Sequence, residues 1–438
     1  MDAPFFLNDA MAYFSSLAYC PYAKTTVGNE SESVFFGNIF SRRFVKDATH
    51  GIPYLRASEI QKADLSGGGL YLSKRQAEHL SHLRFQKGMI LVTCSGTLGK
   101  CAYADARFED FIGTHDLIRI VPRKQNLLPG VLYAFLAGRF GYATLTHSQY
   151  GSVILHTNPT QVKAIPIPVF PEKLQDRVHR LISDSAQLRE EADIARNEAI
   201  GYFAHYDVEK QATCFSKKLS EIGFSFAAYN NNLDVDAILH KYRYNSVSIG
   251  ELSDRIFAPL LFKHIYLDHD NGHPFFTGRE MTCQNVRPYR WLSPLGVKDI
   301  QDYKLEKGML LLYKSGTTGN GSILGNVVIA DDNFDGVCLS DHVIRIRMKD
   351  LELAYWAYAF LKSQAGIKLL QALATGTMIP FITVPRLASL RIPKPDGDLE
   401  KISRLVSEYI AKRVKSNNQE NEAIALIEAE IASWQEDG

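Results

Sequence analysis

The stretch from Lys87 to Lys100, KGMILVTCSGTLGK, has glycines that lead to a lysine, as a phosphate-binding loop does. A Walker A loop needs a glycine, four further residues and then Gly-Lys-Ser/Thr. Here Cys94 stands where the first glycine belongs, and Cys101 follows the lysine, so no hydroxyl is offered to magnesium. The spacing therefore does not predict a nucleotide site.

The same stretch occurs twice, because residues 307–320 are KGMLLLYKSGTTGN, without the final lysine. Further segments repeat at offsets between 220 and 226 residues: Gly51-Ile-Pro53 and Gly272-His-Pro274, THDLIRI from Thr114 and SDHVIRI from Ser340, YAFL from Tyr133 and from Tyr358, and Ile167-Pro168 and Ile392-Pro393. This period is far too long for a solenoid. The chain is therefore expected to contain a duplicated pair of domains, with residues 1–35 the part that matches the second copy least.

Composition is that of an ordinary globular protein. The chain has 438 residues, of which 46% are hydrophobic and 22% charged, and this length suggests two to four domains. Its six cysteines form no CxxC pair, so neither a zinc cluster nor a disulfide framework is indicated, and a reducing cytoplasm is expected. The N-terminus has no basic region of the secretory kind, and no apolar run approaches membrane-spanning length.

The net charge of +1 hides an alternation along the chain. The number of Lys and Arg residues minus the number of Asp and Glu residues gives a net charge of +5 for residues 1–170, −3 for 171–212, +4 for 213–395 and −5 for 396–438. Mild basicity is only a weak pointer to nucleic acid. Two basic segments that alternate with two acidic segments nevertheless suggest two separate contact surfaces held apart by the acidic segments.

Apolar patterning predicts a mixed α/β fold in each copy. Short buried strands are expected at MILVTC and MLLLYK, before the Ser-Gly-Thr turns, and further strands at LIRIVP and VIRIRM. Single helices are expected over residues 130–146 and 354–373. Proline keeps IPIPVFP and RIPKPDG extended.

Each copy is followed by a segment with helical heptads. In the first, the seam runs Leu174, Val178, Leu181, Ser185, Leu188, Ala192, Ala195, Ala199, Tyr202; in the second it runs Leu399, Ile402, Val406, Ile410, Val414, Asn417, Asn421, Ile424, Ile427, Ile431, Trp434. Asn417 and Asn421 set the register, or SNNQEN interrupts the helix. Two such seams most simply pack on each other, the alternative being that each lies on its own domain as an amphipathic helix.

Together these segments resemble the specificity subunit of a type I restriction-modification enzyme. The resemblance lies in the order and duplication of GIPYLRASEI, KGMILVTCSGTLGK, THDLIRI, TNPTQVKAIPIPVFP and the long helix, and LDVDAILHKYRY from Leu233 is similar to the start of a family repeat. It implies two target-recognition domains, residues 1–170 and 213–395, each reading one half of a split site in double-stranded DNA. It also implies two long antiparallel coiled-coil helices, residues 171–212 and 396–438, as spacer and as docking surface for two modification (methyltransferase) subunits, with restriction subunits joining through the complex.

A catalytic site of the chain's own is not expected. After Asn158-Pro159 comes threonine, so the Asn/Asp-Pro-Pro-aromatic loop of a DNA amino-methyltransferase is missing, and no Gly-rich cofactor fingerprint follows a strand. Asp302-Tyr303-Lys304 is the one close acidic-x-Lys group, a pattern that arises by chance. No histidine spacing indicates a metal. We therefore expect no cofactor and no metal, and the resemblance to the specificity subunit implies that catalysis lies on other subunits.

Candidate DNA contacts follow the strands as turns and loops, where hydroxyl, amide and cationic groups can meet phosphates or base edges. The candidates are Arg56, Ser95, Thr97, Lys100, Tyr150, Ser152, Arg279, Lys314, Ser315, Thr317, Asn320, Thr375 and Thr377. Structural explanations remain open: the Ser-Gly-Thr turns as plain turns, Arg56 and Arg279 as solvated or paired, and His115-Asp116 and Asp341-His342 as caps.

The sequence leaves three interpretations of the function. A DNA sequence reader within a restriction-modification complex is favoured. A duplicated scaffold or tethering protein that lacks specific DNA readout is the alternative, and a stand-alone nuclease or methyltransferase is disfavoured by the missing motifs.

Overall fold

The computed structural model describes residues 9–65, 69–147, 156–209, 214–222, 225–288, 290–317, 323–376 and 378–434. The chain forms two compact units. Unit 1 comprises residues 1–190 and 415–438, and unit 2 comprises residues 191–414. Each unit is described by itself.

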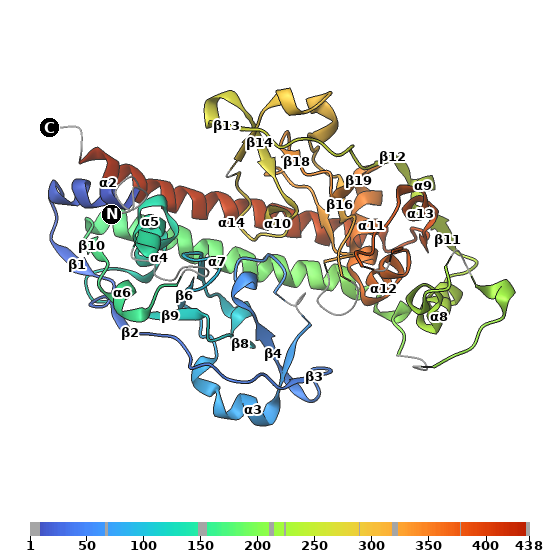
Figure 1. The fold of residues 1–438 in the computed structure, drawn as a ribbon, viewed down its shortest axis with the longest axis horizontal. Helices are drawn as coiled ribbons and strands as arrows, with labels where there is room; N and C mark the ends of the chain where they lie inside the picture. The colour runs from blue at the N-terminus through green and yellow to red at the C-terminus, as the bar shows by residue number, and fades with distance from the viewer. Residues whose placement is uncertain are drawn as a thin grey trace. The chain divides into compact units, whose positions relative to one another are not determined.

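Unit 1 contains two four-stranded sheets (Figure 1). The first has the order β2 (Ser31–Phe35), β9 (Leu117–Pro122), β6 (Ile90–Thr93), β7 (Cys101–Tyr103) and is antiparallel throughout. The second has the order β3 (Phe44–Val45), β5 (Tyr71–Ser73), β4 (Gly51–Leu55), β8 (Ile112–Gly113), and only its β4–β8 pair is parallel. A separate pair joins β1 (Lys24–Thr26) to β10 (Pro166–Pro168).

Unit 2 repeats this topology strand for strand. Its sheets have the orders β12 (Ser253–Phe257), β19 (Val343–Met348), β16 (Leu310–Tyr313), β17 (Val327–Ile329) and β13 (Tyr266–Leu267), β15 (Arg290–Leu292), β14 (His273–Phe276), β18 (Cys338–Leu339), with β11 (Ser246–Ser248) paired to β20 (Arg391–Pro393). Again only one pair, β14 with β18, is parallel. The predicted strands and extended proline segments are confirmed, and so is the duplication of a mixed α/β domain.

The N-terminal region completes the first repeat, although its sequence hides this. A helix, α2 (Asp9–Ala18), precedes β1 and β2, as α8 (Leu233–Lys241) precedes β11 and β12. Strand β2 also pairs with β9 through the same register shift that occurs between β12 and β19. Backbone pairing can be kept while side chains diverge, because sheet hydrogen bonds use only main-chain groups.

The two single helices expected from sequence are each a pair of helices. Residues 130–146 belong to α4 (Pro129–Ala137) and α5 (Arg139–His147), and residues 354–373 to α11 (Leu351–Lys362) and α12 (Gln364–Ala372). The break lies at Gly138, whose backbone is extended, and at Ser363, whose hydroxyl accepts a hydrogen bond from Gly366 N and so caps α12. The two helices of each pair approach so closely that a Cβ at Gly141 would lie 2.1 Å from the Phe135 carbonyl oxygen.

Smaller helices complete the units. They are α3 (Lys74–His79) and α6 (Pro159–Lys163) in unit 1, and α9 (Ile249–Leu252), α10 (Gly278–Met281) and α13 (Val384–Ser389) in unit 2. Among the residues described above, no helix is both long and apolar enough to cross a membrane.

Two long helices, α7 (Glu172–Gly201) and α14 (Leu399–Ser433), each contribute to both units and lie side by side in each (Figure 1). In unit 1 they run antiparallel, since Arg177 pairs with Glu422 at 2.6 Å while Ser185 and Ser416 exchange hydrogen bonds of 2.9 and 3.1 Å. In unit 2, Lys412 pairs with Glu191 at 2.9 Å. The predicted helix pair is confirmed, and α14 continues through SNNQEN without interruption.

The seam predicted for α7 is partly wrong. Ile182, Ala186 and Arg189 are buried, whereas Leu174 and Leu181 are only half-buried. The reason is that α7 packs on its own domain as well as on α14: in unit 1 its apolar side chains share one core with those of α4 and α14. A helix covered on two sides buries a broader face than a two-stranded seam.

Candidate nucleic-acid interface

The Ser-Gly-Thr turn of unit 1 joins β6 to β7 and is closed by its own hydrogen bonds. Thr93 Oγ1 donates to the Thr97 carbonyl and accepts a 3.0 Å hydrogen bond from Lys100 N. The Lys100 ammonium lies 4.9 Å from the centre of the Tyr142 ring, a cation–π contact. Thr97 and Lys100 thus help to stabilise the turn itself, as in the structural explanation that the sequence left open.

Ser95, in the same turn, leads to a polar cluster on the surface of unit 1. Its hydroxyl donates to Asp116 Oδ1 at 3.2 Å, at the start of β9. Next to Asp116, His115 Nδ1 lies 3.1 Å from Arg42 Nη2, and Arg42 Nε donates to the Tyr54 hydroxyl at 2.8 Å. The β6–β7 turn, the start of β9, the end of β4 and the loop between β2 and β3 therefore meet at one place.

Sequence reasoning missed Arg42 and Tyr54. Arg42 also donates to Thr114 Oγ1 at 3.3 Å, and its guanidinium lies 5.8 Å from the centre of the Phe40 ring. The signal that could have found them is the interleaving of basic and aromatic residues in FSRRF, which begins at Phe40.

Unit 2 places the equivalent groups together. Lys314 N donates to the His342 carbonyl at 2.9 Å, which joins the β16 turn to the start of β19. His264 Nε2 lies 4.0 Å from Asp341 Oδ1, and the His264 ring lies 5.2 Å from that of Phe275. His264 follows β12 as Arg42 follows β2, so an equivalent polar cluster recurs with different side chains.

The later loop of unit 2 folds onto its turn. Ser315 and Thr375 each form a β-bridge with Phe381, and Thr375 N donates to the Phe381 carbonyl at 2.8 Å. Lys314, Ser315 and Thr375 thus lie in one patch, half-buried, with Thr317 exposed beside it in sequence. In unit 1, Ser95 bridges His156 in the same way. Of the other candidates, Tyr150, Ser152, Asn320 and Thr377 lie outside the described residues.

The two candidate arginines differ from each other. Arg56 Nη2 donates to Glu59 Oε1 at 2.9 Å, and the Glu59 side chain is only 2% exposed. Burial alone would raise the pKa of Glu59, but hydrogen bonds from Arg56 and the nearby Lys62 lower it. Arg56 is therefore paired, whereas the exposed Arg279 has no guanidinium partner within the described parts of the chain.

A buried arginine stands behind each cluster, and neither was anticipated. Arg119 and Arg345 are 0% exposed and occupy equivalent positions on β9 and β19. Arg119 donates to the carbonyls of Leu117, Leu83 and Thr114 at 2.9, 3.1 and 3.3 Å. Burial lowers the pKa of both guanidinium groups to about 10. These arginines hold the backbone at the start of the strand, where the cluster residues sit.

The arrangement offers hydrogen-bond donors, hydrogen-bond acceptors and cationic groups. Among the residues that the structure describes, no three His, Cys, Asp or Glu side chains are placed to hold a metal ion. Asp302, of the acidic-x-Lys group, lies 3.6 Å from Arg255 as a surface ion pair.

Comparison with known proteins identifies the family. A family model described as type I restriction modification DNA specificity domain matches residues 35–184 and again residues 242–426. The chain belongs to this family, and it is a DNA specificity subunit of the type I restriction-modification class with two such domains. A search of curated proteins finds no match.

Solved structures of low sequence identity are similar over nearly the whole chain. The S subunit of a type I restriction-modification system from M. genitalium is 12% identical, with a TM-score of 0.35 over 95% of this chain and 96% of that one. The HsdS subunit from Thermoanaerobacter tengcongensis is 14% identical, with a TM-score of 0.29 over 94% and 96%. A chain from a structure of type I R-M complex assembly and conformational transition is 15% identical, with a TM-score of 0.31 over 95% and 97%. Because these scores are below 0.5, the family assignment rests on the family model.

Proposed function

We propose that each unit reads one half of a bipartite site in double-stranded DNA. The observation that carries this proposal is the recurrence of one polar surface cluster at the same place in two topologically identical domains. A protein that binds two half-sites needs two such surfaces, and different side chains on each allow the half-sites to differ.

The proposed contacts are the candidate residues of the turns and loops. In unit 1 they are Ser95, Thr97 and Lys100, with Arg56, Tyr150 and Ser152; in unit 2 they are Arg279, Lys314, Ser315, Thr317, Asn320, Thr375 and Thr377. Arg279 is the strongest of them for a guanine, because an exposed guanidinium can donate two parallel hydrogen bonds to O6 and N7. Arg56 would first have to release Glu59.

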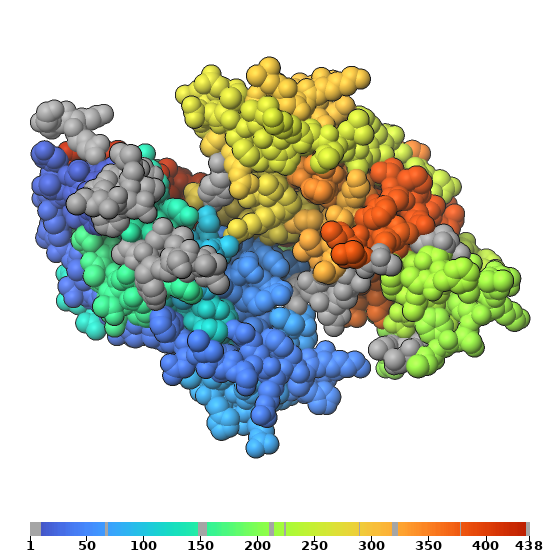
Figure 2. Space-filling view, viewed as in Figure 1, coloured from blue at the N-terminus to red at the C-terminus, as the bar shows by residue number. Residues whose placement is uncertain are grey.

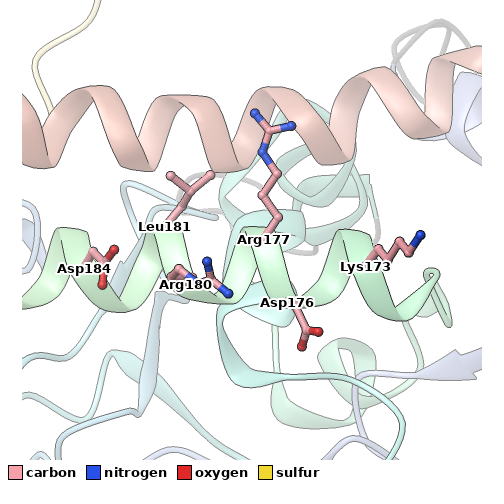
Figure 3. A pocket seen from close by; sticks show the side chains of 6 residues that line it. All are labelled: Lys173, Asp176, Arg177, Arg180, Leu181 and Asp184. Atoms are coloured by element: carbon pink, nitrogen blue, oxygen red, sulfur yellow. The ribbon is translucent and has the colours of Figure 1, made fainter.

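In this proposal the domains and the long helices have separate roles. Residues 1–170 and 213–395 act as recognition domains, while residues 171–212 and 396–438 set the gap between half-sites and dock two modification subunits. Restriction subunits join through that complex. A groove of about 490 Å³ along α7 supports docking in unit 1; its lining is Lys173, Asp176, Arg177, Arg180, Leu181 and Asp184. Arg177 and Leu181 point toward α14 and Asp176 away from it (Figure 3), and five of the six lining side chains are charged.

Catalysis belongs, in this proposal, to the other subunits of a cytoplasmic complex. The purified chain should then neither cleave nor methylate DNA, whereas addition of modification subunits should produce site-specific methylation. Metal-dependent cutting by the chain alone, abolished by Asp302→Ala, would instead favour a nuclease.

Exchange of one recognition domain tests the assignment of half-sites. Residues 213–395 are replaced by the equivalent segment of a relative, and methylated sites are mapped by sequencing. One half of the target should change while the other half is retained. A change in both halves would contradict independent readers, and unchanged targets would favour a scaffold.

A further inference from the structure

Each unit exposes an aliphatic side chain in the loop that joins the first strands of its two four-stranded sheets. Ile39, between β2 and β3, is 85% exposed, and Leu261, between β12 and β13, is 81% exposed beside Leu260 at 82%. Ile39 and Leu261 are 222 residues apart, as are the first residues of β2 and β12, so they are equivalent in the repeat. One exposed aliphatic residue needs no explanation, but the same exposure at equivalent positions indicates a shared requirement.

The residue after each of these side chains is anchored on the domain. The Phe40 ring meets the His115 ring edge-on at 6.2 Å, and the Phe262 ring lies 4.4 Å from that of Tyr303. The Tyr303 hydroxyl also donates to the Leu260 carbonyl at 3.1 Å. The loops are therefore attached beside the polar clusters, and the two aliphatic side chains remain outside that attachment.

Cationic side chains accompany both loops. Arg43 is exposed, and within the residues described its guanidinium has no partner, while Lys263 is exposed in the second loop. In Figure 2 the surface around β3 is among the blue atoms of unit 1, and that around β13 is among the yellow atoms of unit 2. Exposed apolar and cationic groups within a few residues of each other in each loop fit a ligand with an apolar interior and an anionic rim.

We propose that Ile39 and Leu261 pack against the apolar surface of DNA bases, while Arg43 and Lys263 meet neighbouring phosphates. Duplex DNA has this combination, because thymine methyl groups and unstacked base steps accept aliphatic side chains and phosphates accept cations. The inference rests on the proposed function and adds to it a contact other than the polar cluster.

Serine substitutions in the complete complex with modification subunits test the contact. Ile39→Ser and Leu261→Ser should each weaken binding to the target duplex by about tenfold to a hundredfold, the loss expected for one fully buried aliphatic side chain. Each should also reduce discrimination at its own half-site only. Leu219→Ser is the matched control, since Leu219 is 74% exposed but lies outside both loops. Arg43→Ala should lower the slope of log affinity against log salt by about one.

Two modified duplexes identify the base surface. If replacing thymine by uracil removes the difference between Ile39→Ser and the parent, the contact is a thymine methyl. If 2-aminopurine becomes fluorescent with the parent and not with Ile39→Ser, the side chain unstacks a base step. Either result supports the proposal.

Unchanged DNA affinity in Ile39→Ser and Leu261→Ser would overturn it. Loss of complex assembly with DNA affinity retained would also overturn it, because the aliphatic groups would then contact protein. Both results leave the proposed function intact, whereas a parent complex without any sequence preference would refute the proposed function itself.

Discussion

A buried ion pair between the long helices in unit 1 allows a quantitative test of what holds them together. Arg189 of α7 pairs with Glu420 of α14, and both side chains are only 6% exposed. The Tyr133 hydroxyl donates to Glu420 Oε1 at 3.0 Å. Burial alone would lower the pKa of Arg189, but the Glu420 carboxylate raises it above its ordinary value. The charged state is thus maintained by its partner.

Arg189→Ala would leave the Glu420 carboxylate buried without its cation. Breaking a buried pair in this way costs about 3–5 kcal/mol. For a unit of roughly 200 residues, each kcal/mol lowers the melting temperature by about 2–4 °C, so we expect a decrease of roughly 6–20 °C in the unfolding of unit 1. Replacing the network with apolar groups in Arg189→Met, Glu420→Met and Tyr133→Phe together should restore the parent value approximately, because no charge remains to be desolvated.

Differential scanning calorimetry of the full chain measures these effects. Arg177→Ala is the matched control: Arg177 pairs with Glu422 across the same helices, but the side chains are 60% and 46% exposed, so the loss should be below about 1 kcal/mol. If Arg189→Ala melts no lower than Arg177→Ala, the buried pair does not support the helix contact, and the reasoning from burial is refuted.

Three further predictions follow from the same structure. Gly141→Ala should lower the free energy of unfolding by about 1–3 kcal/mol or more, and with it the melting temperature, because its Cβ would lie 2.1 Å from the Phe135 carbonyl oxygen. A Cβ at Gly201 would meet no atom within 4 Å, so Gly201→Ala should leave the melting temperature unchanged, and equal melting of the two variants would contradict the prediction. The pKa of Glu59 is lowered in the folded chain, so its contribution to stability is present above a pH of about 4.5 and is lost as the pH falls through its folded pKa. Glu59→Gln should therefore reduce the fall in melting temperature between neutral and acidic pH, and an unchanged fall would contradict this prediction. One heptad inserted into α7 between Leu188 and Ala192, with another into α14 between Ile410 and Val414, adds about 10 Å of helix and should lengthen the gap between half-sites by about three base pairs in methylation maps; an unchanged gap in a folded variant would argue against the spacer role.

Much of the fold follows from local pattern in the sequence. The strands β6, β9, β16 and β19 lie where short apolar runs end at turns, and the extended segments β10 and β20 lie where proline excludes helix. The repeated segments predicted two copies of one domain, and heptad spacing predicted both long helices. The helix breaks at Gly138 and Ser363 were missed because apolar spacing continues across them, and only the close packing of successive helices requires the break.

The candidate site was predictable in position but not in composition. Ser95 and Ser315 were expected from their turns; Ser95 donates to Asp116 at the start of β9, and Ser315 forms a β-bridge with Phe381 in the later loop of unit 2. Arg42 and Tyr54 were not expected, since Arg42 reaches that place from the loop between β2 and β3 and Tyr54 from β4. Whether any of these groups contacts DNA stays a prediction.

Residue order and local spacing are enough to predict that this chain carries one α/β domain twice, with a long heptad helix after each copy. The three-dimensional packing shows in addition that residues 9–35 complete the first copy, that Arg119 and Arg345 are buried behind the polar clusters, and that Ile39 and Leu261 are left exposed. Local patterns do not predict these features, because burial and hydrogen-bond partners depend on segments far apart in the chain. Arg119, for example, binds carbonyls of Leu83 and Thr114, and nothing in the local sequence around the arginine specifies the first of these partners.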